Sequence, residues 1–370
     1  MKTDRDTYTI SEKESGVFNV LKAIFIVMVV FIHAYNYFEK GAMNMEGTDI
    51  AIELPAQMIF IMDLFSRKIS EIANYGFFFL AGLFLFRKDF SFANNIKKKI
   101  KTLVIPAIIV TTFWIVIYIA GEAIPFTRHF FANPDRMILQ WDLLHWLDAY
   151  FAISPGSYML VYPLWFAKEL FLLNILAYPM KLLMDRWPVI MIAVILAFCF
   201  WGSNIPVIGS VIPINISFFA GYYVVHYGIH LESIENIKMW MISLVYAMTL
   251  VVSYIELPGL AGNLIGKLSI AVSFVFWYKV ATEIFNKASG RIKKAVLVIA
   301  KYSFLIYIMH ELNLRLLQKI VFKLMPGNNV SYAIQYMACP VVIIALIVLF
   351  SILLEKKLPA LYSLLSGGRK

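Results

Sequence analysis

The segment from Phe18 to Phe38 constrains the fold of this chain more than any other stretch. Its sequence, FNVLKAIFIVMVVFIHAYNYF, is apolar apart from two basic or titratable side chains, Lys22 and His33. A helix of about 20 residues crosses a bilayer core of roughly 30 Å, because each residue adds about 1.5 Å. We therefore expect a membrane-spanning helix. It is not expected to be a cleaved signal peptide, because its apolar core is long and no small-residue cleavage site follows it.

Three polar side chains share one face of this predicted helix. Lys22 and His33 are eleven residues apart, and eleven steps of about 100° return to nearly the same direction. Asn36 follows His33 by three residues and extends the polar stripe. Ionisable groups inside a span are costly unless they face a bundle interior or a wet cavity, so the stripe indicates a functional site. The structural alternative is a snorkelling Lys22 with an interfacial His33 bonded to a neighbouring helix.

The composition places the whole chain in a membrane. Hydrophobic residues make up 61% and charged residues 15% of the 370 residues, and the mean hydropathy is +0.75, whereas soluble domains are about half apolar and a quarter charged. Spans and short connections then leave no room for a separate globular domain, so residues 1–370 are expected to form one domain. The basic residues behind the net charge of +10 lie mostly between spans, which argues against a nucleic-acid partner.

Metal and disulfide chemistry find little support in the sequence. The two cysteines, Cys199 and Cys339, both lie in apolar runs and are expected to pack in the core. His226 and His230 resemble a metal-binding pair in their spacing only. No metal site is predicted.

The hydropathy pattern predicts an all-α, polytopic protein with about ten transmembrane helices. We expect spans at about residues 18–38, 72–86, 103–120, 158–183, 189–202, 212–225, 239–257, 264–284, from about 295, and 332–354. The most basic connection precedes the third span, and such connections stay in the cytosol, so both termini are expected to be cytoplasmic. The predicted cytosolic tails are 1–17 and 355–370, the longest external loop is 121–157, and an amphipathic external piece lies at 50–65.

The external loop contains the sequence WDLLHWLD, which places Asp142, His145 and Asp148 near one another on a helix. A binding lid is one interpretation. The other is an interfacial helix that anchors the loop through Trp141 and Trp146.

Two later spans also carry charge. Lys168 and Glu169 interrupt the fourth span, and His310 and Glu311 lie in the ninth. Glu169 must either form a structural ion pair or point into a cavity, where it would be able to orient a histidine.

These residues resemble the motifs of the acyltransferase family 3 membrane proteins, which O-acylate sugars and polysaccharides in bacteria. The family's first-span signature is a basic residue, ten residues and a histidine, which corresponds to Lys22 and His33, with lysine where arginine is commoner. The other motifs correspond to Phe77–Phe79, Ala81 and Gly82 (Ala81 departs from the usual serine), Lys98 and Lys101 before Pro106, Trp165, Phe166, Lys168 and Glu169, and Tyr307 and His310.

The resemblance implies transfer of an acyl group, usually acetyl from acetyl-CoA, to a hydroxyl of a cell-surface polysaccharide or a lipid-linked sugar at the bacterial inner membrane. His33 would be the general base, because imidazole titrates near neutral pH, and Glu169 its orienting acid, with Glu311 the second candidate. Acyl-CoA would be a donor substrate, with no permanently bound cofactor. Expected donor-binding residues are Lys22, Lys98 and Lys101, and expected substrate-binding residues are Asn36, Trp165, Lys168, Tyr307, His310 and Glu311.

Two other function classes remain open. In a transporter or flippase for a sugar, lipid or small solute, the same polar residues would line a path. A scaffold or sensor would not require buried charged residues. The lysines of the basic connection also have an alternative role, since such connections set orientation in any inner-membrane protein.

Overall fold

The computed structural model describes residues 8–39, 42–43, 49–50, 54–131, 138–201, 212–255, 259–325 and 327–369. The expected outer turn at 203–210 and the first seven residues of the expected cytosolic tail lie outside these ranges. The described chain is helical apart from connections and one two-residue ladder, in which β1 (Ala42–Met43) pairs antiparallel with β2 (Asp49–Ile50). The prediction of an all-α membrane protein is confirmed.

The helices fall in the stretches that hydropathy predicts. The first half of the chain contains α1 (Glu12–Glu39), α2 (Ala56–Asp63), η2 (Leu64–Ile69), α3 (Ile72–Phe86), α4 (Phe92–Lys99), η3 (Ile100–Val104), α5 (Ile105–Ala123), α6 (Pro125–Phe131), η5 (Ile138–Gln140), α7 (Leu143–Phe151), η6 (Tyr162–Leu164) and α8 (Trp165–Arg186). The second half contains α9 (Pro188–Trp201), α10 (Ile212–His226), η8 (Leu231–Asn236), α11 (Met239–Val252), α12 (Gly259–Lys287), α13 (Gly290–Leu324), α14 (Asn329–Lys357) and α15 (Pro359–Leu365).

Among the described residues, six helical runs are long and apolar enough to cross a membrane. They are Glu12–Asn36, Ala56–Phe86, Phe92–Ala123, Leu264–Lys287, Gly290–Leu324 and Asn329–Lys357. Helices α8 to α11 occupy the other four predicted spans, and α9, α10 and α11 contribute shorter apolar stretches. A helix therefore lies in each stretch predicted to span.

Two of these helices begin earlier than the sequence analysis expected. The apolar run of α2 continues through η2 towards α3, so most of the piece at 50–65 is helical. The stretch that carries Lys98 and Lys101 was expected to be a loop, but it lies in α4 and η3. Lysine is a good helix former, and the hydroxyl of Ser91 accepts a hydrogen bond from the backbone N–H of Asn94 in the first turn of α4.

The chain forms two compact units, each assembled from three segments. Unit 1 comprises Met1–Ile26, Lys68–Lys98 and Glu169–Lys301, and unit 2 comprises Val27–Arg67, Lys99–Lys168 and Tyr302–Lys370. Neither unit is contiguous in sequence. The expected single domain over 1–370 stays a prediction.

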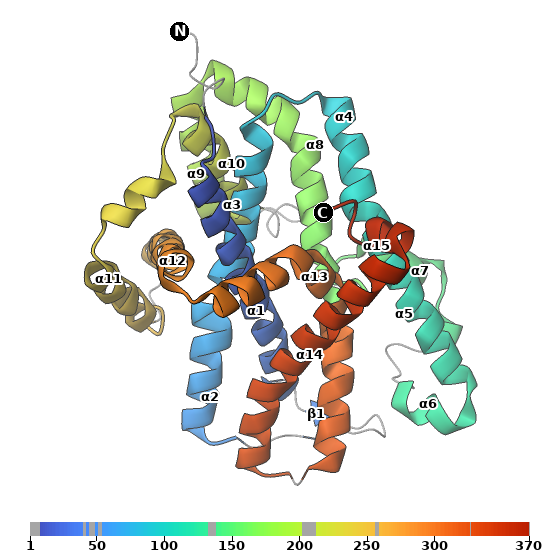
Figure 1. Ribbon diagram of the computed structural model, residues 1–370. Coiled ribbons are helices and arrows are strands. Elements are labelled where there is room, and N and C mark those ends of the chain that lie inside the picture. Colours follow the sequence, from blue (N-terminus) through green and yellow to red (C-terminus); the bar gives the residue numbers. More distant parts are fainter. Residues whose placement is uncertain are drawn as a thin grey trace. The chain divides into compact units, whose positions relative to one another are not determined.

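In unit 1, α3 and α10 touch at their backbones, and Figure 1 shows the two helices side by side. A Cβ atom at Gly82 would lie 1.9 Å from the carbonyl oxygen of Phe218, and one at Gly221 would lie 2.3 Å from the backbone nitrogen of Leu83. Gly76, six residues before Gly82, faces an aromatic ring of α1 in the same way. The small residues of α3 thus allow close helix contact here.

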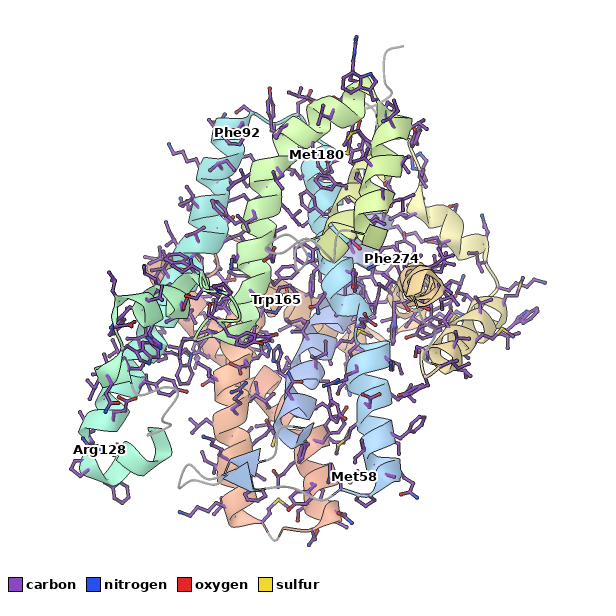
Figure 2. All side chains as sticks on the ribbon, turned by 180° about the vertical axis from the view of Figure 1, so that it is seen from behind. Met58, Phe92, Arg128, Trp165, Met180 and Phe274 are labelled. Atoms are coloured by element: carbon purple, nitrogen blue, oxygen red, sulfur yellow. The ribbon has the colours of Figure 1, made fainter. Side chains whose placement is uncertain are left out.

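Unit 2 is built around a hydrophobic cluster between α5, α7, α13 and the stretch before α8. Its buried members are Val110, Trp114, Ile115, Ile138, Ala149, Met159, Leu160, Val161, Leu164, Ile308 and Leu312. Figure 2 labels Trp165 at the first turn of α8, directly after this stretch. The cluster thus fixes the start of α8 against α13.

Replacing Gly82 by alanine should lower the melting temperature of the detergent-solubilised protein by several degrees. The added methyl meets a backbone carbonyl that cannot rotate away, and overpacking of this kind costs roughly 1–3 kcal/mol. Gly266→Ala in α12 is the matched control, because a Cβ there meets no atom of the described structure within 4 Å. If Gly82→Ala melts with the wild type, the helices do not cross this closely.

Candidate active site

Two histidines from distant parts of the sequence meet in unit 2. His33 lies on α1 and His310 on α13, and their ring centroids are 4.9 Å apart with an interplanar angle of 63°. Both side chains are buried, with exposed fractions of 9% for His33 and 0% for His310. The sequence analysis gave them separate roles, whereas the structure brings them together.

The hydrogen bonds of His310 define its tautomer. Its Nδ1 lies 2.9 Å from the carbonyl oxygens of both Ile306 and Tyr307. Carbonyl oxygens only accept, so Nδ1 carries the proton and donates it. Nε2 then keeps a lone pair, and it has no hydrogen-bond partner among the residues that the structure describes. His310 is therefore a fixed, buried acceptor beside His33.

Tyr307 holds the first turn of α8. Its hydroxyl donates to the carbonyl oxygen of Pro163 at 2.8 Å and accepts from the backbone N–H of Ala167 at 3.0 Å. The first N–H groups of a helix have no partner within it, so Tyr307 satisfies one of them from α13. Its ring also packs against Phe166, at a centroid distance of 5.6 Å.

This anchoring places a further aromatic residue next to the histidines. Tyr162 in η6 contacts His33 edge to face, with centroids 6.1 Å apart. The sequence analysis missed Tyr162, whose only signal was its place before Pro163 and the charged start of the fourth span. His33 thus contacts a buried imidazole and a half-exposed phenol.

The other predicted residues of unit 2 have varied surroundings. Lys168 donates from Nζ to the carbonyl oxygen of Ala152 at 3.0 Å and so ties α8 to the end of α7. Glu311 is buried and forms an ion pair with Nε of Arg315 at 2.6 Å. Asn36 and Trp165 are half-buried, and Lys101 in η3 is exposed.

Three predicted site residues belong to unit 1. Glu169 is buried in α8, with an exposed fraction of 8%. Lys22 is half-buried on α1, and Lys98 is exposed on α4. Their roles stay predictions.

The polar residues of the loop at 121–157, which is expected to be external, stabilise the ends of α7. Oδ1 of Asp142 accepts from the backbone N–H of His145 at 2.9 Å, and this bond, together with the His145 ring, holds the pKa of Asp142 below its usual range. Oδ1 of Asp148 accepts two backbone N–H bonds just beyond the helix. Trp141 and Trp146 pack onto the cluster of unit 2. Both interpretations of this segment, a binding lid and an interfacial anchor, stay predictions.

Unit 1 contains a small polar cavity of about 60 Å³ between α11, α12 and the start of α3. Lys68 lies at its edge and donates from Nζ to the carbonyl oxygen of Ser253 at 3.0 Å. Hydroxyls of Thr249 and Ser273 also line it but donate to carbonyls of their own helices. The cavity is large and polar enough for water.

Comparison with known proteins gives one match. The sequence model of the acyltransferase family 3 domain, described as an acyltransferase domain, matches residues 16–355. The chain belongs to acyltransferase family 3. No curated protein and no solved structure matches it. The resemblance seen in the sequence is confirmed, and this family 3 protein is a multi-pass membrane acyltransferase.

Tyr307→Phe should destabilise this acyltransferase, because it leaves the N–H of Ala167 without its acceptor. A buried unpaired donor costs about 1–3 kcal/mol. Thermal unfolding in detergent measures the loss, and Tyr158→Phe is the control, because Tyr158 is 70% exposed. Equal melting temperatures for Tyr307→Phe and the wild type would show that this hydroxyl does not hold α8.

Proposed function

We propose that the protein transfers an acyl group, most simply acetyl, from acyl-CoA to a hydroxyl of a cell-surface polysaccharide or lipid-linked sugar. We place it in the bacterial inner membrane with ten spans and both termini in the cytoplasm. The observation that carries the proposal is the contact of His33 with His310 inside a chain that belongs to acyltransferase family 3.

The chemistry requires one base. A sugar hydroxyl is a weak nucleophile, and His33 takes its proton as the oxygen attacks the thioester carbonyl. The tetrahedral intermediate then expels the CoA sulfur, which receives a proton from the imidazolium. The products are the O-acyl ester and free CoA, and His33 returns to its neutral form.

Three groups are candidates to assist His33. His310 has geometric support, because its Nε2 lone pair lies on a buried ring that contacts the His33 ring. Such an acceptor is able to fix the tautomer of a neighbouring imidazole, as a carboxylate does in a catalytic triad. Glu169 is the carboxylate proposed from the sequence. Glu311 is weaker, because Arg315 already neutralises it.

The donor phosphates require cations, which we assign to Lys22, Lys98 and Lys101. The exposure of Lys98 and Lys101 supports this role, because both ammonium groups are accessible to a soluble ligand. Asn36, Trp165, Lys168, Tyr307, His310 and Glu311 remain the proposed contacts for substrate. For Lys168 and Tyr307, the structure adds the backbone contacts that hold α8.

His33→Ala should abolish acyl transfer while the protein still inserts and folds, because an alanine methyl is less costly in a span than imidazole. Purified protein is incubated with labelled acetyl-CoA and host surface glycan, and free CoA and labelled glycan are measured. Release of CoA at the wild-type rate by His33→Ala would remove His33 from the chemistry.

His310→Gln and Glu169→Gln, assayed beside it, identify the assisting group. The variant that removes the orienting group should show a turnover lower by roughly 10²-fold or more, with little change in donor binding. Wild-type protein in detergent that performs no CoA chemistry, but moves solute in vesicles, would favour a transporter.

Replacing both Lys98 and Lys101 by glutamine should raise KM for acetyl-CoA and weaken its dependence on salt. Electrostatic capture of an anionic donor is screened by ions, so removing the cations removes the screening effect as well. The matched control replaces Lys293 and Lys294, which lie in another predicted cytosolic connection. An unchanged KM at low ionic strength would leave the first pair a role in topology alone.

A further inference from the structure

The segment after α15 folds back onto η3, directly before α5. Gly367 and Gly368 have positive φ angles of 63° and 72°, which other residues rarely adopt. A Cβ at Gly367 would lie 2.7 Å from both Cα and the carbonyl oxygen of Thr102. Glycine is thus needed for the turn and for the close approach, and the turn brings Arg369, within unit 2, to the carbonyl oxygen of Thr102.

The Arg369 guanidinium is held in a defined place. Nη1 donates to the carbonyl oxygens of Thr102 at 3.0 Å and Ser366 at 2.8 Å. The guanidinium carbon lies 3.6 Å from the ring centroid of Phe304 on α13. Stacking on an aromatic face leaves the edge of the guanidinium available, and Nε and Nη2 keep donors that these two bonds do not use.

This cation has no anionic partner in the described part of the chain. No carboxylate among the described residues lies within ion-pair distance of Arg369, and the acceptors of its guanidinium are the neutral carbonyls of Thr102 and Ser366. Arg369 is exposed, so a soluble anion is able to reach its guanidinium, which is charged at neutral pH. An exposed guanidinium that no described carboxylate neutralises is available to a soluble anion, and its fork of donors matches phosphate.

The position of Arg369 relates it to the donor. Thr102, its hydrogen-bond partner, follows Lys101, which we assign to the donor phosphates. Phe304 precedes His310 by six residues on α13, or about 9 Å along the helix axis. A cation displaced in this way is suited to the phosphates of a ligand whose thioester reaches the histidines.

We propose that Arg369 is a phosphate-binding residue of the donor site and takes a phosphate of acyl-CoA on its free edge. The proposal rests on the proposed function. Arg369 lies beyond residues 16–355, so the family match does not include it. A phospholipid headgroup offers the same phosphate chemistry, and the experiment separates the two sources.

Arg369→Gln should raise KM for acetyl-CoA by roughly tenfold with little change in kcat, because a charge-assisted bond to phosphate is lost. The KM of Arg369→Lys should lie between those of the wild type and Arg369→Gln, since lysine keeps the charge but not the fork of donors. Arg291→Gln is the control: this arginine is exposed and lies in a predicted cytosolic connection. Gly367→Ala should also raise KM, because it displaces Arg369 without changing the charge.

Melting temperatures identify any variant that fails to fold, and Arg369→Lys and Gly367→Ala then carry the test. An unchanged KM for Arg369→Gln, with an active wild type, overturns this inference and leaves the proposed function intact. A wild type without CoA release overturns both. If Arg369→Gln instead loses only the response of turnover to vesicles containing an anionic phospholipid, the group binds lipid and the donor assignment is wrong.

Discussion

The geometry of unit 2 depends on the two hydrogen bonds of the Tyr307 hydroxyl. The hydroxyl donates to Pro163 and accepts from the N–H of Ala167, and so closes the gap between α13 and the first turn of α8. A helix start in an apolar environment needs such a partner, because little water is available for its free N–H groups. With this turn fixed, Tyr162 lies against His33, and Lys168 reaches the end of α7.

Helix α13, which carries Tyr307, also supplies polar groups around the histidines. Nδ1 of His310 donates its proton to carbonyl oxygens of the preceding turn of α13, so Nε2 keeps a lone pair. His310 follows Tyr307 by three positions, and Glu311 is neutralised by Arg315 one turn later. One face of α13 thereby combines the anchoring hydroxyl of Tyr307 with the Nε2 acceptor of His310. The adjacent carboxylate of Glu311 pairs with Arg315. For the proton transfer that we propose for His33, this arrangement favours assistance by His310 over a direct pairing with Glu311.

Local signals were sufficient for the helices and for part of the site. The apolar run from Phe18 to Phe38 predicts α1, and the glycines of α3 predict its close contact with a neighbouring helix. The start of the third span was harder to predict, because lysines occur in helices as readily as in cytosolic loops. The contact of His33 with His310 was not predictable from the sequence, because neither segment indicates which helix it packs against. Tyr162 was missed for the same reason.

Arg369 lies outside the part of the chain that matches the family model. The match to acyltransferase family 3 ends at residue 355, within α14, whereas α15 and the two glycines lie beyond it. These residues nevertheless bring a cation onto Thr102 and Phe304, which lie inside the matched range. If Arg369 binds a phosphate of the donor as we propose, a segment beyond the matched range contributes to donor affinity. The base and its surroundings would then belong to the family, whereas the strength of donor capture would be set by this chain.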